Sequence, residues 1–137
     1  MQKLRQSGTI IGFVLIIAFF SFQLPDTFLT ARNLLNISQQ LSMLAVVAAT
    51  MTIVMVMNDF DLSVGSMASL SGIVAASLFV NEYSIWAGIG AALVVGLVGG
   101  LFNGILVSVV GILPFVATLG TLTAYSGAAF LISDGKT

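Results

Sequence analysis

Long runs of apolar residues follow one another along this chain with very few charges between them. Only 7% of the residues are charged, whereas a soluble domain carries about 25%. Such a chain cannot cover itself with a surface that water solvates. Inside a bilayer the backbone must satisfy its own hydrogen bonds, and the runs are too long and too continuous for the strands of a barrel. The sequence therefore predicts an all-α integral membrane protein.

Five of these runs approach the length of roughly 20 residues that a helix needs to cross a bilayer. Pro25 ends the first run because proline cannot continue the hydrogen-bond ladder. Thr30 is a suitable N-cap for the second run, and Gly111 and Pro114 end the fourth. The fourth run exceeds one hydrocarbon thickness at about 1.5 Å per residue and should tilt or break. The predicted spans are residues 9–24, 30–57, 62–80, 85–110 and 115–132.

The orientation in the membrane rests on few charges. Lys3 and Arg5 favour a cytoplasmic N-terminus. Five spans then place the C-terminus outside and residues 58–61 on the cytoplasmic side, although Arg32 would lie outside, against the rule. The short connection at residues 58–61 is either a loop or a helix break buried at membrane depth, which is allowed where it lines a cavity.

Several chemistries are excluded by what the sequence lacks. It has no cysteine and no histidine, which removes disulfides, thiolate or imidazole metal sites and histidine acid–base catalysis. It has no basic patch that would bind nucleic acid. No predicted span carries a charge in its middle, as a proton-coupled carrier or voltage sensor usually would. We therefore expect no catalytic residue, no metal and no cofactor, and a path for a neutral polar solute that is driven from elsewhere.

Two carboxylates, Asp59 and Asp61, separate the second and third runs. Asp61 or Ser63 is well placed to cap the third helix, since a side-chain oxygen can satisfy an N–H that has no partner in the helix. A direct ion or proton role for the carboxylates is the alternative. Gly65 continues this motif and opens a face of small residues on the third span, which we expect to pack against another helix.

Polar side chains on two spans are candidates for a solute path. Ser66 and Ser77 lie on the side of the third span opposite its small residues, and they either bond back to their own turn or form a polar strip. On the second span, amide side chains recur on one face at helical spacing. The candidate path residues are Asn33, Asn36, Gln40, Ser66 and Ser77.

The fourth span carries a small residue at every fourth position, which lets another helix approach closely. The alternative is a sliding or hinge surface for alternating access. Asn103 lies within this apolar span, and an intramembrane amide needs a hydrogen-bond partner; it either clamps a neighbouring helix or contacts solute. The residues of this small-residue ridge are Gly88, Ala92, Gly96, Gly100 and Gly104.

Four segments, in order along nearly the whole chain, carry a family resemblance. They are residues 28–37 (FLTARNLLNI), 59–66 (DFDLSVGS), 99–104 (GGLFNG) and 114–120 (PFVATLG). Together they resemble the membrane permease subunits of bacterial ABC importers for ribose, xylose and arabinose. The sequence DFD at residues 59–61, with ISDGK at residues 132–136, is most similar to the arabinose-type branch.

The resemblance implies a permease core in the bacterial inner membrane, with a second permease subunit as partner. It also implies two cytoplasmic ATPase subunits, which would hydrolyse ATP in place of this chain, and a periplasmic sugar-binding protein. Family members have about twice as many spans and a later loop that docks on the ATPase. We therefore expect residues 1–137 to form one transmembrane permease domain that is incomplete at its C-terminus, the N-terminal part of a larger helical bundle.

Two functions from other classes stay open. One is a small stand-alone membrane protein that oligomerises through its glycine ridge and transports nothing. The other is a self-sufficient channel.

Overall fold

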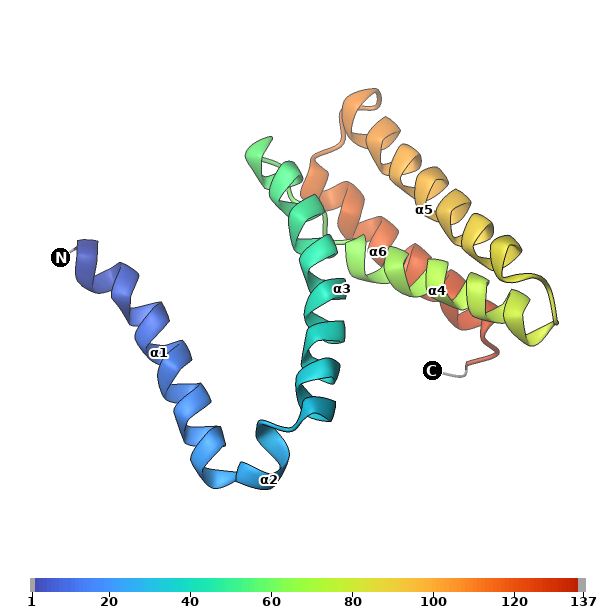
Figure 1. Ribbon diagram of the computed structural model, residues 1–137. Coiled ribbons are helices and arrows are strands. Elements are labelled where there is room, and N and C mark those ends of the chain that lie inside the picture. Colours follow the sequence, from blue (N-terminus) through green and yellow to red (C-terminus); the bar gives the residue numbers. More distant parts are fainter. Residues whose placement is uncertain (1, 136–137) are drawn as a thin grey trace. The chain divides into compact units, whose positions relative to one another are not determined.

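The computed structural model describes residues 2–135, with side chains from Gly8 onward, and within this range it contains helices and turns and no strand. The side chains of Lys3 and Arg5, and Lys136 at the end of the ISDGK segment, lie outside the described part. The predicted orientation therefore stays a prediction. The helices are α1 (Gln2–Gln23), α2 (Pro25–Phe28), α3 (Ala31–Val56), α4 (Val64–Val80), α5 (Ile85–Ser108) and α6 (Pro114–Ile132) (Figure 1).

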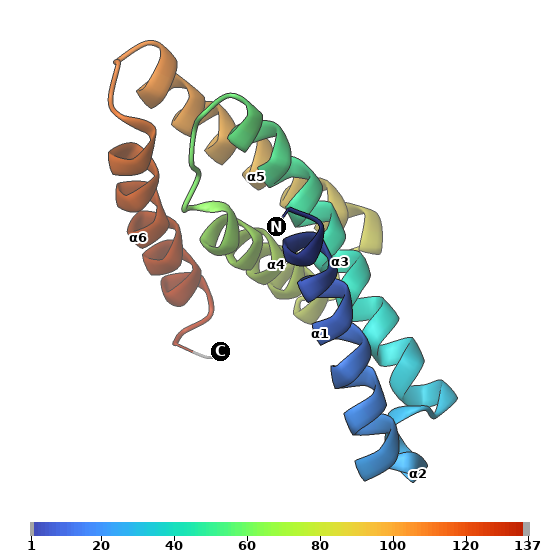
Figure 2. The same cartoon turned by 90° about the vertical axis from the view of Figure 1, so that its left-hand side faces the viewer.

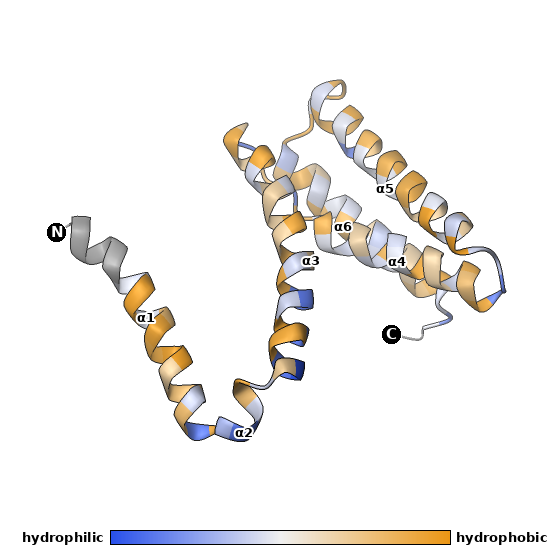
Figure 3. Cartoon of the chain, viewed as in Figure 1, coloured by the Kyte–Doolittle hydropathy of each residue, from blue (hydrophilic) through white to orange (hydrophobic). Residues whose placement is uncertain are grey.

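The apolar helices confirm the predicted class of membrane protein. Three of them, α3, α5 and α6, are long and apolar enough to cross a membrane, while α4 and the part of α1 from Gly8 are apolar but shorter. Hydrophobic residues cover much of α5 in particular (Figure 3). The five predicted spans correspond to α1, α3, α4, α5 and α6, and the fourth continues for 24 residues without a break.

The starts of three helices follow from local sequence. Thr30 Oγ1 accepts the backbone N–H of Asn33 at 3.3 Å and so caps α3 as predicted. Pro25 and Pro114 are the first residues of α2 and α6, where the missing N–H of proline costs nothing. Pro114 therefore starts a helix and does not end one, because α5 has already ended at Ser108.

The helix ends share a second local feature. After α3, α4 and α6 the chain turns through a non-glycine residue with positive φ, and the next N–H bonds back to a carbonyl five residues earlier. In such turns the N–H group bonds to a carbonyl that has no hydrogen-bond partner within the helix. The residues are Asn58, Glu82 and Asp134, with φ of 61°, 60° and 50°, and the bonds are Asp59 N to Val54 O, Tyr83 N to Leu78 O and Gly135 N to Phe130 O, at 3.0–3.2 Å.

The chain divides into two compact units, one up to Val46 and one from Val47 onward. In the first unit, α1 contacts the short α2, and the rings of Phe20 and Phe28 stack with centroids 5.7 Å apart. This stack fixes the reversal between α1 and the start of α3.

In the second unit, α4 packs against both α5 and α6, and we call these three the three-helix group (Figures 1 and 2). Its interior is small and polar: three apolar residues are buried, and so are four polar ones. Large apolar side chains of α5 and α6 lie on the outside instead, which suits a lipid environment in which close packing and hydrogen bonds hold helices together. Apart from Gly88 and Gly99, the buried residues are Leu70, Ala117, Ala129, Ser63, Asn103, Thr118 and Thr121.

Candidate functional site

A chain of hydrogen bonds begins at Asp61, just before α4. Asp61 Oδ1 accepts the backbone N–H of Ser63 at 2.7 Å and the Ser63 hydroxyl at 2.6 Å. Ser63 Oγ in turn accepts the side-chain N–H of Asn103 at 2.7 Å. Ser63 is the most deeply buried side chain of the described residues, with 1% exposure. The chain therefore joins the start of α4 to α5 through groups that lipid does not reach.

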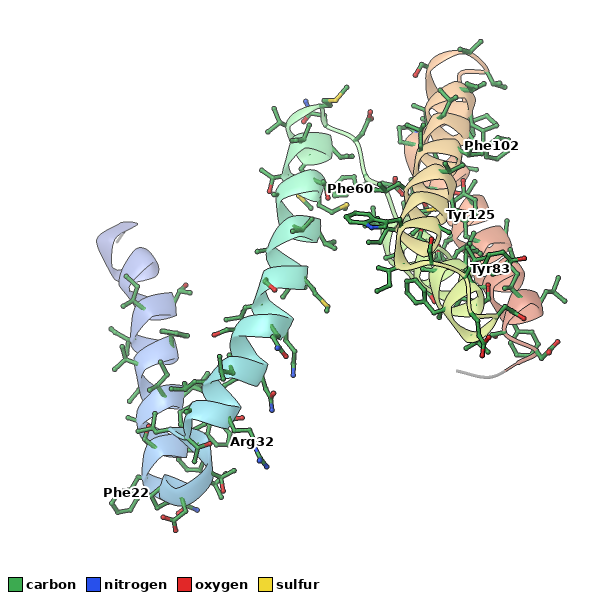
Figure 4. The ribbon with its side chains drawn as sticks, turned by 45° about the vertical axis from the view of Figure 1, so that its right-hand side comes forward. Phe22, Arg32, Phe60, Tyr83, Phe102 and Tyr125 are labelled. Atoms are coloured by element: carbon green, nitrogen blue, oxygen red, sulfur yellow. The ribbon has the colours of Figure 1, made fainter. Side chains whose placement is uncertain are left out.

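The same chain reaches α6 through Tyr125. The Tyr125 hydroxyl donates to the carbonyl of Gly99 at 3.0 Å and lies 3.4 Å from Asn103 Oδ1. Tyr125 is labelled within the three-helix group in Figure 4. We call Asp61, Ser63, Asn103 and Tyr125 the polar network, because it connects the three helices of the group.

Of the two capping residues that the sequence offered, Asp61 accepts a backbone N–H at the start of α4 and Ser63 does not. The Ser63 hydroxyl forms no bond to a helix N–H, because it is bound to Asp61 and Asn103. The Asp61 carboxylate accepts a hydrogen bond from the backbone N–H of Ser63, the residue directly before the helix. The carboxylate also lies at the helix N-terminus, where the helix dipole favours negative charge.

The small-residue ridge of α5 does not pack along its whole length. Gly88 meets the ring of Phe79, which occupies the space that a Cβ would need. At Gly100 and Gly104 a Cβ would have no atom within 4 Å, and at Gly96 only Ser71 Oγ at 3.9 Å. Within the described residues, the prediction of a continuous packing ridge is therefore met at Gly88 alone of these glycines.

The close approach near the polar network occurs at Gly99, which the predicted ridge did not include. A Cβ on Gly99 would collide with the end of the Met67 side chain and lie 3.4 Å from Tyr125 Cζ. The missing side chain at Gly99 thus lets the Tyr125 hydroxyl reach the α5 backbone.

Two hollows lie beside the polar network. One, of about 450 Å³, is lined by α4 and α5 residues together with Asp61 and Thr50 of α3, and a second, of about 220 Å³, lies between the ends of α3 and α5 and the start of α6. Asp61, Gly100 and Asn103 line both, so the two form one groove along α5, which we call the α5 groove. Its other lining residues include Asp59, Ser63, Ser71, Gly96 and Gly104.

The predicted path residues are divided between the two units, with Asn33, Asn36 and Gln40 in the first and Ser66 and Ser77 in the second. Asn36 and Gln40 are exposed in the first unit, and Asn33 donates to the Phe28 carbonyl at 2.7 Å. Ser66 and Ser77 bond back to carbonyls of their own helix or its cap at 2.8 Å, which is the local alternative that the sequence left open. A solute role for these five residues stays a prediction.

The small face of α4 is exposed in the described part of the chain, so its packing against another helix stays a prediction. A Cβ added to Gly65 or Gly72 would have no atom within 4 Å, and Ser69 and Ala76 are exposed. The opposite face of α4 carries the contacts to α5 and α6, through Met67 and Leu70 among others.

Sequence reasoning missed Ser71 and Tyr125. Ser71 was one serine among several on an apolar helix, and no periodic signal distinguishes it. Tyr125 is one of only two tyrosines in the sequence, and a hydroxyl in the middle of an apolar span was a usable signal, because it needs a partner there. Among the described residues no three His, Cys, Asp or Glu side chains come together as metal ligands do.

Exchanging Asp61 separates the capping role from a role of its charge. Asparagine keeps an oxygen that can accept both Ser63 bonds, so Asp61→Asn should be mild. Asp61→Ala leaves the Ser63 N–H and hydroxyl without their acceptor and should cost about 1–2 kcal/mol in stability. Thermal unfolding in detergent measures the stability of each variant, and solute uptake at matched expression measures function. Equal losses in both variants would show that the charge of Asp61 matters and that its capping bond does not.

The apolar helices, with a groove between them that carries a few polar groups, define a multi-pass helical membrane protein. Residues 33–137 match the family described as branched-chain amino acid transport system / permease component. The chain belongs to this family of transporter permeases, and the resemblance to permease subunits of ABC sugar importers is confirmed.

Several curated relatives are similar along nearly the whole chain. The L-arabinose ABC transporter permease protein AraH of Azospirillum brasilense is 33% identical over 134 residues, 98% of this chain and 39% of that protein. The ribose import permease protein RbsC of Haemophilus influenzae is 35% identical over 97% of this chain and 41% of its own length. The D-allose transport system permease protein AlsC of Escherichia coli is 35% identical over 94% of this chain and 40% of its own length.

The chain thus spans about two fifths of the length of these relatives. No solved structure matches it.

Proposed function

We propose that this chain forms the membrane-spanning part of a permease subunit that imports a neutral sugar, a pentose such as arabinose among the candidates. The α5 groove carries the proposal: its lining offers hydroxyl, amide and carboxylate groups along a membrane helix. The names of the relatives support sugars as the solute class, since they concern arabinose, ribose and allose.

The energy for import would come from partners. The sequence offers no catalytic constellation, so we assign ATP hydrolysis to cytoplasmic ATPase subunits and solute delivery to a periplasmic sugar-binding protein. A second permease subunit, identical or related, would complete the membrane part. The N-terminus would lie in the cytoplasm, which follows from Lys3 and Arg5.

Reconstitution tests this function directly. The permease expressed from its native gene is placed in liposomes with the ATPase and the binding protein encoded beside it. Uptake of radiolabelled L-arabinose, D-ribose and D-allose is then measured with ATP and with a non-hydrolysable analogue. We expect accumulation of at least one sugar with ATP only. Uptake that continues when the ATPase is omitted would contradict the mechanism.

A stand-alone oligomerising protein is the second candidate, and the exposed small face of α4 favours it. Small residues let helices of neighbouring subunits approach closely. This candidate predicts a homo-oligomer of the purified protein and no uptake in the reconstituted system.

A further inference from the structure

The α5 groove has a floor without side chains. Gly96, Gly100 and Gly104 lie one above another on α5, because positions four apart share a helix face. Nothing but the Ser71 hydroxyl comes within 4 Å of a Cβ built on any of them. These glycines therefore serve no close approach within this unit, and their missing side chains leave the space that the groove occupies.

The groove reaches from the end of the helix to its middle. Gly96 lies at the midpoint of α5, and Asp61 lies beside Asn103 near its end. Polar groups follow the whole length: Ser71 opposite Gly96, then Ser63 and Asn103, then Asp61. Exposure of such groups to hydrocarbon is costly. Ser63 and Asn103 are buried and bonded to each other, so the partly exposed Ser71 and Asp61 are the groups that favour water or polar neighbours in an otherwise largely apolar groove.

The charges of the lining restrict what enters. The charged residues that line the described groove are Asp59 and Asp61, with no lysine or arginine beside them. Anions such as sugar phosphates would be repelled. A carboxylate only accepts hydrogen bonds, an amide both donates and accepts, and a serine hydroxyl does both. This set matches the hydroxyl groups of a neutral polyol, and the larger hollow of about 450 Å³ falls within the range of small-molecule sites, about 300–1,000 Å³.

We propose that the α5 groove is the passage for a neutral polyhydroxylated solute through this unit. Asp61, Asn103 and Ser71 supply its hydrogen bonds. Gly96, Gly100 and Gly104 set its width. The inference rests on the proposed function and adds to it the residues that contact the solute.

Filling the groove should stop uptake and leave the fold intact. Gly100→Leu places a side chain in open space, so we expect an unchanged melting temperature in detergent and a loss of sugar uptake in the reconstituted system. Gly96→Leu should act in the same way. Gly90→Leu is the matched control, because Gly90 is on the same helix, has open space around its Cβ position and does not line the groove.

The outcomes separate this inference from the proposed function. If the parent protein transports sugar and Gly100→Leu transports equally well, the passage is elsewhere and only the inference fails. If Gly100→Leu loses stability and assembly, the groove is filled by another helix in the assembled permease, which also overturns the inference. If the parent transports no sugar, the proposed function fails.

Cysteine labelling tests the groove without transport. The chain has no natural cysteine, so single substitutions report one position each. Ser71→Cys and Gly100→Cys in membranes should react with a small hydrophilic methanethiosulfonate reagent, and L-arabinose or D-ribose at high concentration should slow the reaction. Leu97→Cys on the outer face of α5, where the native side chain is 73% exposed, should stay unreactive in lipid. Unreactive groove positions would overturn the inference whatever the uptake results.

Discussion

The substitution Asn103→Asp is expected to destabilise the three-helix group by about 3–5 kcal/mol, because it places a negative charge in a buried position without a partner of opposite sign. The two side chains have the same shape, but a carboxylate cannot donate the bond that Ser63 Oγ accepts from the Asn103 amide at 2.7 Å. Two carboxylates, that of Asp61 and the new one, would then compete for the single hydroxyl proton of Ser63. The Ser63 side chain is only 1% exposed, so its hydroxyl depends on residues 61 and 103 for its hydrogen bonds, even though the groove lies beside it. Chemical unfolding in detergent at neutral pH measures the loss.

Asn103→Leu is the control without the added charge. It loses the bond to Ser63 and should cost less, about 1–3 kcal/mol. Combined with Ser63→Ala, it should cost less than the sum of the two single changes, because both remove the same bond. If Asn103→Asp were as stable as the parent, the donor in this pair would not be the amide, and the polar network would be wrong.

The second large effect is expected at Gly99. In Gly99→Leu the new side chain would occupy the space of the Met67 side chain and approach the Tyr125 ring. Overpacking of this kind costs about 1–3 kcal/mol. The Tyr125 hydroxyl should also be displaced from the Gly99 carbonyl, which it reaches at 3.0 Å. We therefore expect a lower melting temperature together with a changed environment of Tyr125, measured by its fluorescence or by ultraviolet absorbance.

Three further variants show whether the effect of Gly99→Leu comes from overpacking at this position. Gly99→Ala should be milder, because the end of the flexible Met67 side chain can move aside while the Tyr125 ring stays in contact. Gly100→Leu, one residue further, points into open space and should melt like the parent. Tyr125→Phe removes the hydroxyl alone and isolates the part of the loss that comes from its bond. Equal stability of Gly99→Leu and Gly100→Leu would show that α4 and α6 do not approach α5 at Gly99.

Most of the fold follows from simple patterns in the sequence. Apolar runs gave the number and order of the long helices, because in a bilayer length and hydropathy decide which segments become helices. The cap at Thr30 also followed from residue type and position. Pro114 was predicted to end the fourth span, but it is the first residue of α6. A proline can stop one helix or start the next, and the sequence pattern alone does not distinguish the two cases.

The arrangement of the site depended on contacts that periodicity does not encode. The spacing of the glycines on α5 indicates a face that is free of side chains, but it does not say whether a helix or a hollow lies against that face. The answer depends on neighbours such as Met67, which extends to Gly99 and leaves Gly100 open. Ser63 could likewise be read as a cap, because its partner Asn103 is 40 positions away in the sequence.

The left-handed turn at Asn58 determines how α3 can end beside the α5 groove. The N–H of Asp59 returns to the Val54 carbonyl at 3.2 Å, so the end of α3 supplies part of its own bonding. A helix that ends in this way does not depend on the aqueous surface to reverse direction, and such a break is tolerated at membrane depth beside a polar cavity. The chain then leads straight to Asp61 and the groove. The residues between α3 and α4 can therefore lie along the α5 groove, which Asp59 and Asp61 both line, without leaving the Val54 carbonyl unpaired.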